Sequence, residues 1–226
     1  MSWGSQFLWV IYPYMILIIF LVGLYYRYQT DQFGWTAKSS EMLEKKKLRW
    51  GSNLFHIGIM LVFFGHVGGI LIPKSWLEAL GVSDHLYHTM ALWIGSAAGL
   101  MTLIGCIFLV IRRFSDVRIR RTSSFGDMLS IILLTLIVVV GMAATLFNMT
   151  DRSGFDYRET IGPWLRGVIQ FMPDYTLMNT VPFIFKIHII LGLALFAVFP
   201  FTRLVHMLSL PIKYLSRSYV VYRKRK

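Results

Sequence analysis

Two apolar stretches of this chain, Gly51–Ile72 and Val181–Leu210, each contain two histidines, and the first contains no charged residue. The histidines are His56 and His66 in the first stretch and His188 and His206 in the second. An ionisable side chain in a membrane-length apolar segment is costly to bury, so such residues indicate a functional site. Imidazole is also a common metal ligand. The first expectation from the sequence is therefore a ligand site built by two apolar helices.

The composition indicates an integral membrane protein. Of the 226 residues, 56% are hydrophobic and 15% are charged, and the mean hydropathy is +0.59. A run of about 20 apolar residues is long enough to cross a bilayer core as a helix. The chain contains such runs at Phe7–Tyr26, Leu54–Ile72, Met90–Ile111, Met128–Met149 and Val181–Leu210. We therefore predict an all-α membrane protein, a five-transmembrane-helix bundle in which residues 1–226 form one domain.

The basic residues predict the orientation of this bundle. Most of the 23 Lys and Arg residues lie between the first and second runs, between the third and fourth, and in the C-terminal tail. Because positively charged loops remain in the cytoplasm, the N-terminus is predicted outside and the C-terminus in the cytoplasm. The net charge of +12 then reflects topology and contact with anionic lipid, or docking of soluble partners on Phe33–Trp50 and Ser209–Lys226, and not nucleic acid binding.

The predicted topology sorts the four histidines by depth. His56 and His206 fall near the cytoplasmic ends of their runs, and the other two lie toward the outer side. At about 1.5 Å of rise per residue, the two histidines of one run are roughly 15 Å or 27 Å apart, too far to share a metal. We therefore predict an outer pair, His66 with His188, and an inner pair, His56 with His206. The unequal spacings require helix tilt, or a bend that Pro200 can supply.

Haem suits these pairs better than zinc does. Zinc sites in proteins use three or four side-chain ligands, whereas each level here offers two. A porphyrin supplies the other four nitrogens, and two axial histidines leave an iron that transfers electrons and does not readily bind oxygen. The sequence thus predicts two bound haems. Two explanations stay open for nearby glycines, room for a flat cofactor or close helix packing. These glycines are Gly58, Gly65, Gly68, Gly69 and Gly192.

Other polar residues are sparse within the apolar runs. Arg112 and Arg203 are candidates to contact haem propionates, although both can also extend to lipid headgroups. No Asp or Glu lies deep in a run, which argues against a proton-coupled transporter. A haem-free transporter or assembly factor that uses the histidines as a polar pathway is the alternative from a different class. Cys106 is the single cysteine, so this chain alone forms neither a disulfide nor a thiolate cluster.

Several motifs resemble one protein family. They are Asn53–Ile59 (NLFHIGI), Gly65 with His66, and Phe199–His206 (FPFTRLVH). With these motifs the chain resembles, over nearly its whole length, the gamma subunit of respiratory nitrate reductase. The resemblance implies a dihaem cytochrome b of the bacterial cytoplasmic membrane, with two haem b groups. It also implies two partners on the cytoplasmic face, a molybdenum-containing alpha subunit and an iron–sulfur beta subunit. A haem b anchor of a hydrogenase, formate dehydrogenase or thiosulfate reductase is the neighbouring alternative.

The resemblance further implies that quinol is oxidised near the outer pair. Menaquinol or ubiquinol would release protons outside, and electrons would pass by way of the inner pair to the beta subunit. Well-known members have a lysine just before the third run, whereas Ser83–Thr89 contains none. Tyr87 or His88 can donate a hydrogen bond to the quinol oxygen instead, or His85 and His88 are ordinary polar loop residues. The predicted quinol-site residues are Gly65, Gly69, Tyr87 and His88.

Overall fold

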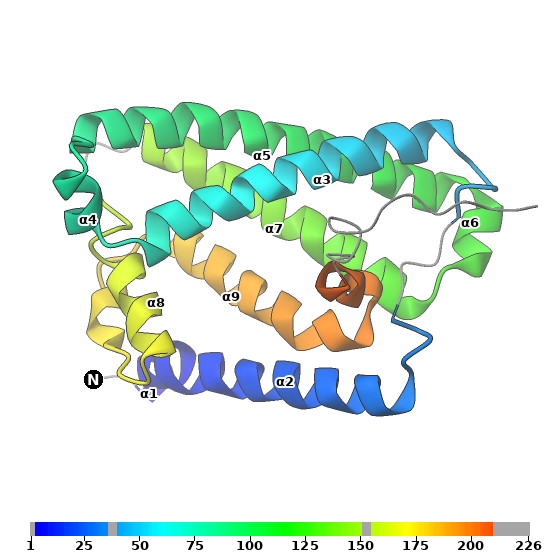
Figure 1. The fold of residues 1–226 in the computed structure, drawn as a ribbon, viewed down its shortest axis with the longest axis horizontal. Helices are drawn as coiled ribbons and strands as arrows, with labels where there is room; N and C mark the ends of the chain where they lie inside the picture. Colours follow the sequence, from blue (N-terminus) through cyan, green and yellow to red (C-terminus); the bar gives the residue numbers. More distant parts are fainter. Residues whose placement is uncertain (1–2, 36–39, 151–154, 210–226) are drawn as a thin grey trace, which may run out of the picture.

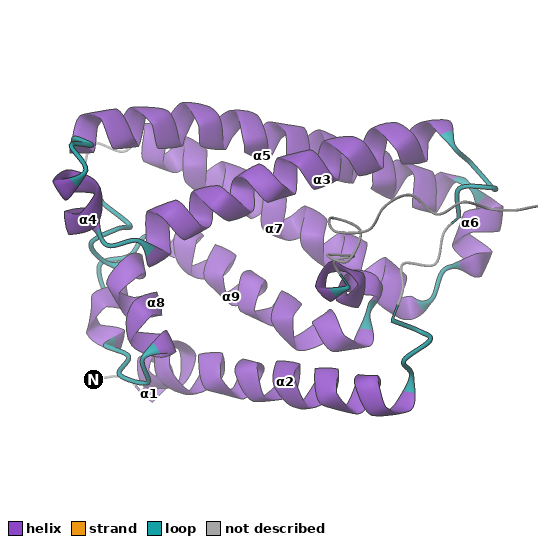
Figure 2. Ribbon diagram, in the orientation of Figure 1, coloured by secondary structure: helices purple, strands orange, loops and turns teal. Residues whose placement is uncertain are grey.

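The computed structural model describes residues 3–35, 40–150 and 155–209. Within these ranges all regular secondary structure is helical, and five helical segments are long and apolar enough to cross a membrane. Figures 1 and 2 show these segments joined by short helices and loops. Their main helices are α2 (Tyr12–Thr30), α3 (Lys46–His66), α5 (Asp84–Ser115), α7 (Phe125–Thr150) and α9 (Phe183–Val198). The predicted all-α bundle of five membrane-length helices is confirmed, while its orientation in the membrane stays a prediction.

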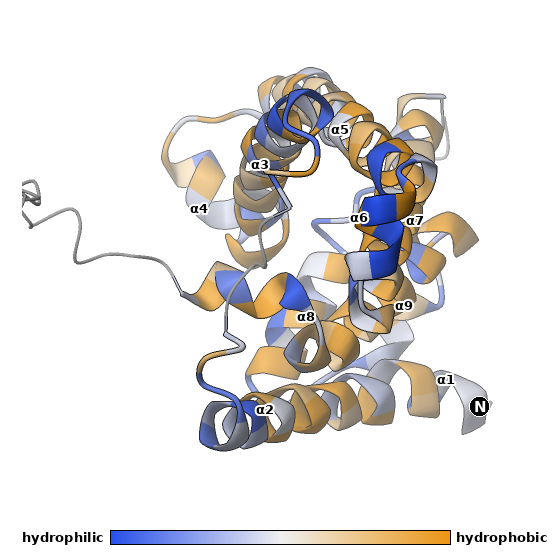
Figure 3. Ribbon diagram, turned by 90° about the vertical axis from the view of Figure 1, so that its right-hand side faces the viewer, coloured by the Kyte–Doolittle hydropathy of each residue, from blue (hydrophilic) through white to orange (hydrophobic). Residues whose placement is uncertain are grey.

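The long helices pack in an arc. α3 lies along α5, α5 along α7, α7 along α9, and α9 along α2. Figure 3 views the arc from one end, with α3 and α2 at its two extremes. Hydrophobic residues dominate these helices, whereas α6 (Val117–Thr122), at the end that faces the viewer, is mainly hydrophilic. The main packing partner of α3 is therefore α5, and its other side faces the interior of the arc.

Glycines allow α3 and α5 to approach closely. A Cβ atom at Gly58 would lie 2.7 Å from the backbone nitrogen of Thr102. A Cβ atom at Gly105 would likewise lie 2.7 Å from the Cα atom of Phe55. Because backbone atoms cannot move aside as a flexible side chain can, any larger residue would push the helices apart. Close packing is thus the explanation for Gly58.

Short helices cap the end of the bundle opposite α6. They are α4 (Lys74–Ala79), α8 (Ile161–Ile169) and the 3-10 turn η3 (Tyr175–Met178). Figure 1 places α4 and α8 at the same end as the N-terminus. Trp164 of α8 is 1% exposed, and its Nε1 donates a hydrogen bond to the carbonyl of Trp9 at 2.9 Å. A buried aromatic anchor therefore fastens the cap to the first membrane segment.

The last predicted run, Val181–Leu210, is not one continuous helix. α9 is followed by two 3-10 segments, η4 (Phe199–Phe201) and η5 (Arg203–Leu208). Pro200 explains the break, because it has no N–H to donate and its ring crowds the preceding turn. The fifth membrane-length segment is therefore Phe183–Phe201, shorter than the predicted run Val181–Leu210. The break also supplies the bend that the unequal spacing of His188 and His206 required.

Candidate cofactor site

The structure brings the four histidines together in the two predicted pairs. The ring centroids of His66 and His188 are 6.1 Å apart, and those of His56 and His206 are 6.2 Å apart. The first pair joins the last residue of α3 to α9, and the second joins the middle of α3 to η5. Both pairs therefore cross the interior of the arc, at two levels of α3.

The distance between the rings suits a metal ion. Two metal–nitrogen bonds of about 2.0 Å, with about 1 Å from each nitrogen to its ring centre, give a centroid separation of about 6 Å. Two imidazoles joined by a direct hydrogen bond would be about 1 Å closer. Among the described residues, no three His, Cys, Asp or Glu side chains form a group that could hold a metal ion by themselves. Each pair thus offers two ligands, the number that the axial positions of a haem require.

Hydrogen bonds orient three of the four rings. In His56 and His66, Nδ1 lies 2.7 Å and 2.8 Å from the carbonyl oxygen of the residue four positions earlier. In His206, Nδ1 lies 2.5 Å from the carbonyl oxygen of Arg203. A carbonyl oxygen only accepts, so Nδ1 carries the proton in each ring and Nε2 keeps its lone pair. Metal-binding histidines are commonly oriented by such a bond from the nitrogen that does not bind the metal.

The fourth ring is held by packing. Nδ1 of His188 is buried near the backbone of Ile137, without a well-formed hydrogen bond among the described residues. The ring lies against Gly141 of α7, where a Cβ atom would come within 2.8 Å of its Cε1. This role of Gly141 was not predicted from the sequence. The available signal was the single glycine within the apolar run Met128–Met149.

Other glycines leave space beside the outer pair. A Cβ atom at Gly65, Gly68 or Gly192 would meet no atom within 4 Å. The first two flank His66 in the sequence, and Gly192 lies one turn after His188. The ring of His66 is itself exposed, although its helix is apolar. These features fit a flat cofactor that lies against the glycines and covers the ring. Close helix packing therefore explains Gly58, whereas room for a flat cofactor fits Gly65, Gly68 and Gly192.

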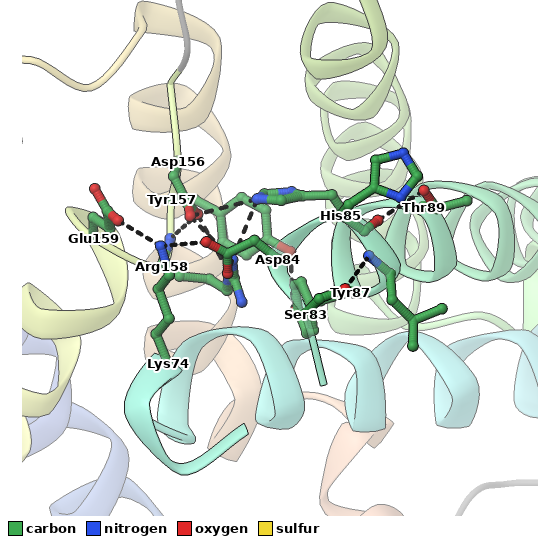
Figure 4. Close-up of polar contacts among 12 residues, drawn as sticks. Lys74, Ser83, Asp84, His85, Tyr87, Thr89, Asp156, Tyr157, Arg158 and Glu159 are labelled. Atoms are coloured by element: carbon green, nitrogen blue, oxygen red, sulfur yellow. Dashed lines mark hydrogen bonds and ion pairs between the residues drawn. The ribbon is translucent and has the colours of Figure 1, made fainter. Parts of the chain in front are cut away.

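A charged network lies in the capped end of the bundle (Figure 4). Lys74 of α4 contacts Asp84 of α5 at 2.7 Å and Glu159 at 2.8 Å. Arg158 contacts Asp84 at 2.8 Å and Asp156 at 3.2 Å. Since Arg158 is 3% exposed, its charge depends on these carboxylates. The hydrogen bond to Asp84, followed by the one to Glu159, raises the pKa of Lys74, so this ammonium stays charged at neutral pH.

Two of the predicted quinol-site residues meet beside this network. The hydroxyl oxygens of Tyr87 and Tyr157 are 3.2 Å apart, and a Cβ atom at Gly69 would come within 2.7 Å of the Tyr87 hydroxyl. The guanidinium carbon of Arg158 lies 4.1 Å from the centre of the Tyr87 ring. Burial raises the pKa of Tyr157 far above its usual value, so this hydroxyl stays neutral. Gly65, in contrast, is surrounded by open space.

The histidines at the start of α5 have different surroundings. Nε2 of His88 lies 3.4 Å from Asp156 and 3.3 Å from Arg158. His85 is exposed, and its backbone carbonyl accepts a hydrogen bond from Thr89. His88 therefore belongs to the charged network, whereas His85 is an exposed residue at the helix start.

Arg112 has protein partners at the opposite end. It is 3% exposed, and its guanidinium donates to Ser40 at 2.8 Å and 3.0 Å and to Glu44 at 2.9 Å and 3.0 Å. These four hydrogen bonds occupy most of its donors. Arg112 thus anchors the loop before α3, and its contact with a propionate stays a prediction.

Arg203 lies beside a second cation. Its Nε is 2.9 Å from a carboxylate oxygen of Asp127, and Nη1 of Arg113 is 3.7 Å from the other oxygen. Asp127 is 8% exposed at the start of α7, a helix that contacts η5. One buried carboxylate therefore faces two cations, and the contact of Arg203 with a propionate stays a prediction.

Comparison with known proteins agrees with this architecture. A family model described as nitrate reductase gamma subunit matches residues 5–225. The chain is 56% identical to the nitrate reductase gamma chain of Bacillus subtilis, covering 98% of this chain and 99% of that one. It is 36% identical to the respiratory nitrate reductase 1 gamma chain of Escherichia coli, over the full length of both. It is also 40% identical to the nitrate reductase-like protein NarX of Mycobacterium tuberculosis, over 98% of this chain and 34% of that protein. The chain belongs to the nitrate reductase gamma subunit family and is a membrane subunit of that oxidoreductase.

Proposed function

We propose that this subunit is a dihaem cytochrome b that transfers electrons from quinol to cytoplasmic partner subunits. One haem b would lie between His66 and His188, and the other between His56 and His206. The observation that carries the proposal is the presence of two histidine pairs with ring centroids about 6 Å apart, at two levels of the same membrane helix. When bound, haem supplies a centre that takes up and gives away single electrons.

The residues of the chain support electron transfer and not oxygen chemistry. The two histidines of each pair would hold the haem iron, and an iron held by two histidines does not readily bind oxygen. His56 and His66 are ten residues apart in the sequence, which is roughly 15 Å along α3. This helix therefore holds both centres at a fixed separation across the membrane segment, and the chain needs no proton channel to move charge between them.

Quinol oxidation is assigned to the capped end, beside the outer pair. Because Gly69 has no side chain, the Tyr87 hydroxyl can lie close to η2 (Val67–Leu71), the π-helical turn directly after His66. Tyr87 can there orient a quinol oxygen by a hydrogen bond. The Tyr87 hydroxyl is in turn hydrogen-bonded to the neutral hydroxyl of Tyr157, which can act as donor or acceptor. With the N-terminus outside, as predicted, protons would be released on the outer side.

Changing Tyr87 to Phe tests this assignment. We expect kcat/KM for a quinol analogue to fall about tenfold in the complete complex, because one orienting hydrogen bond is lost. The reduced-minus-oxidised haem spectrum should not change. His85→Ala is the matched control, since it alters an exposed polar residue at the same helix start. Unchanged kcat/KM in Tyr87→Phe would remove Tyr87 from the quinol site.

The cytoplasmic partners are proposed to be an iron–sulfur beta subunit and a molybdenum-containing alpha subunit. Relatives named gamma chains imply that further subunits exist. In the predicted docking segment Phe33–Trp50, the apolar side chains of Phe33 and Met42 are 98% and 102% exposed. Exposed apolar side chains beside the membrane suit a protein interface. Of the second predicted segment, Ser209–Lys226, residues 210–226 lie outside the part that the structure describes.

Arg112→Ala should weaken this association. The buried guanidinium holds Ser40 and Glu44, and its loss releases the loop that presents Met42. We expect at least about tenfold less beta subunit to co-purify with the tagged gamma chain, since a buried hydrogen-bonded charge is lost. Arg120→Ala, on an exposed side of α6, removes the same charge and should have little effect. Equal recovery from both variants would place the docking surface elsewhere.

Difference spectra of the complete complex test the function as a whole. A quinol analogue should reduce two b-type haems, and nitrate should reoxidise them. Absence of b-type absorption in material produced with adequate haem would overturn the proposal and favour the haem-free transporter or assembly factor. Haem reduction without reoxidation by nitrate would favour the anchor of another quinone-linked oxidoreductase.

A further inference from the structure

The inner ligand His206 is not carried by the helix that carries His188. α9 ends at Val198, Pro200 interrupts the backbone pattern, and His206 lies on the short 3-10 segment η5. A short 3-10 segment has few hydrogen bonds of its own, so its position depends on neighbouring elements. The location of His206 relative to His56 therefore depends on the residues that contact the break in the helix at Pro200.

Arg27 of α2 holds the break from one side. Its Nη1 donates to the carbonyl oxygen of Pro200 at 2.7 Å and to that of Thr202 at 2.8 Å, and its Nη2 donates to the carbonyl of Gly34 at 2.7 Å. The carbonyl groups at an interrupted helix end lack their usual N–H partners. Hydrogen bonds donated by a charged guanidinium are stronger than those between neutral groups, and its planar shape fixes the positions of the acceptors. One side chain thus binds two carbonyl groups of the break, that of Pro200 in η4 and that of Thr202 directly before η5.

Two further residues of α2 approach the same point. A Cβ atom at Gly23 would lie 2.9 Å from both Cβ and Cγ of Pro200. The ring of Phe20 packs edge-on against Phe199, with centroids 5.4 Å apart. Phe20, Gly23 and Arg27 are spaced by three and four residues, so they lie on one face of the helix. This face of α2 therefore packs against Phe199 and Pro200.

The other side of the break connects it to the ligand. The Thr202 side chain accepts a hydrogen bond from the backbone nitrogen of Leu204 at 3.3 Å and so starts η5. Val205, the residue before the ligand, is fully buried. The Arg203 carbonyl in turn orients the ring of His206 at 2.5 Å. A displacement of the Pro200 and Thr202 carbonyls would therefore be transmitted to this ring within a few residues.

We propose that Arg27 is a positioning residue for the inner haem ligand, acting through the Pro200 break. α2 contributes none of the four paired histidines, yet it sets where His206 lies and how its ring is turned relative to His56. The angle between these ring planes is 67°, against 29° in the outer pair. The inference rests on the proposed haem function, and it predicts effects on one haem alone.

The test compares Arg27→Gln and Arg27→Lys in the complete complex. The low-spin EPR signal of a bis-imidazole haem shifts with the angle between its rings, and the midpoint potential responds to ligand orientation. We expect Arg27→Gln to shift the inner signal and to lower inner haem content at least about twofold, with the outer signal unchanged. Arg27→Lys keeps the charge but lacks the fork, so it should rescue haem content only in part. Arg120→Gln, which removes an exposed charge from α6, should leave both signals unchanged.

Gly23→Ala keeps the proposal testable if Arg27→Gln does not accumulate. Its added Cβ would press on Pro200 without changing any charge, so it should shift the same inner signal. Two unchanged signals in Arg27→Gln, or equal loss of both haems, would overturn the positioning role. Failure of the proposed function is a separate outcome, because it would appear in the unaltered complex as the absence of haem.

Discussion

Replacing His206 by leucine is expected to remove the inner haem and to leave the outer haem in place. The ring centroids of His56 and His206 are 6.2 Å apart, a distance that suits one metal bound from each side. Without either ring, a haem at this level would be held by one histidine only. Haem extracted per complex should fall from about two to about one. Quinol:nitrate activity should fall at least about 100-fold, because a ligand of the only predicted electron route is gone.

Four variants, each with one of the paired histidines replaced by leucine, also test the pairing. His56→Leu and His206→Leu should lose the same spectral component, and His66→Leu and His188→Leu should lose the other. His85→Leu is the control for a general effect of removing a histidine, since His85 is exposed and outside both pairs. Loss of both haems in every variant, or of neither, would contradict the assignment of two independent sites. Loss of one component by His56→Leu and of the other by His206→Leu would disprove the pairing alone.

The sequence predicted the spans and the histidine pairs well, for a physical reason. Hydropathy and helical rise are local properties, so the five apolar runs and the depth of each histidine could be calculated from position alone. Helix ends were less predictable. α5 begins at Asp84, before the predicted Met90, because Ser83 accepts a hydrogen bond from the Leu86 backbone nitrogen and starts the helix among polar residues.

Roles that depend on distant partners could not be predicted. The partners of Arg112 lie 68 and 72 residues earlier in the chain, and no spacing rule connects them. Arg27 is still farther from Pro200, at 173 residues. The sequence showed only that Pro200 can bend the last span, whereas the contacts from α2 that hold this bend arise from tertiary packing. The same applies to the charged network that engages His88.

The contact of Gly141 with His188 also depends on tertiary packing, and changing Gly141 to valine should selectively destabilise the outer haem. A Cβ atom there would lie 2.8 Å from Cε1 and 3.2 Å from Nδ1 of His188, closer than atoms that are not bonded normally approach. The ring cannot swing away freely, because it must still face His66 at the distance that a shared iron requires. We expect outer haem affinity to fall about 10- to 100-fold, as for other residues that support a metal ligand.

Haem spectra of the purified complex measure this effect directly. The component lost in Gly141→Val should be the one that His188→Leu removes, and the inner component should persist. Gly99→Ala is the matched control on α5, since its Cβ would meet the thioether of Met142, the movable end of a flexible side chain. Full outer haem content in Gly141→Val would show that His188 tolerates the added bulk and needs no glycine beside it. Equal loss of both components would mean that the valine disturbs the packing of α7 and not the orientation of one ligand.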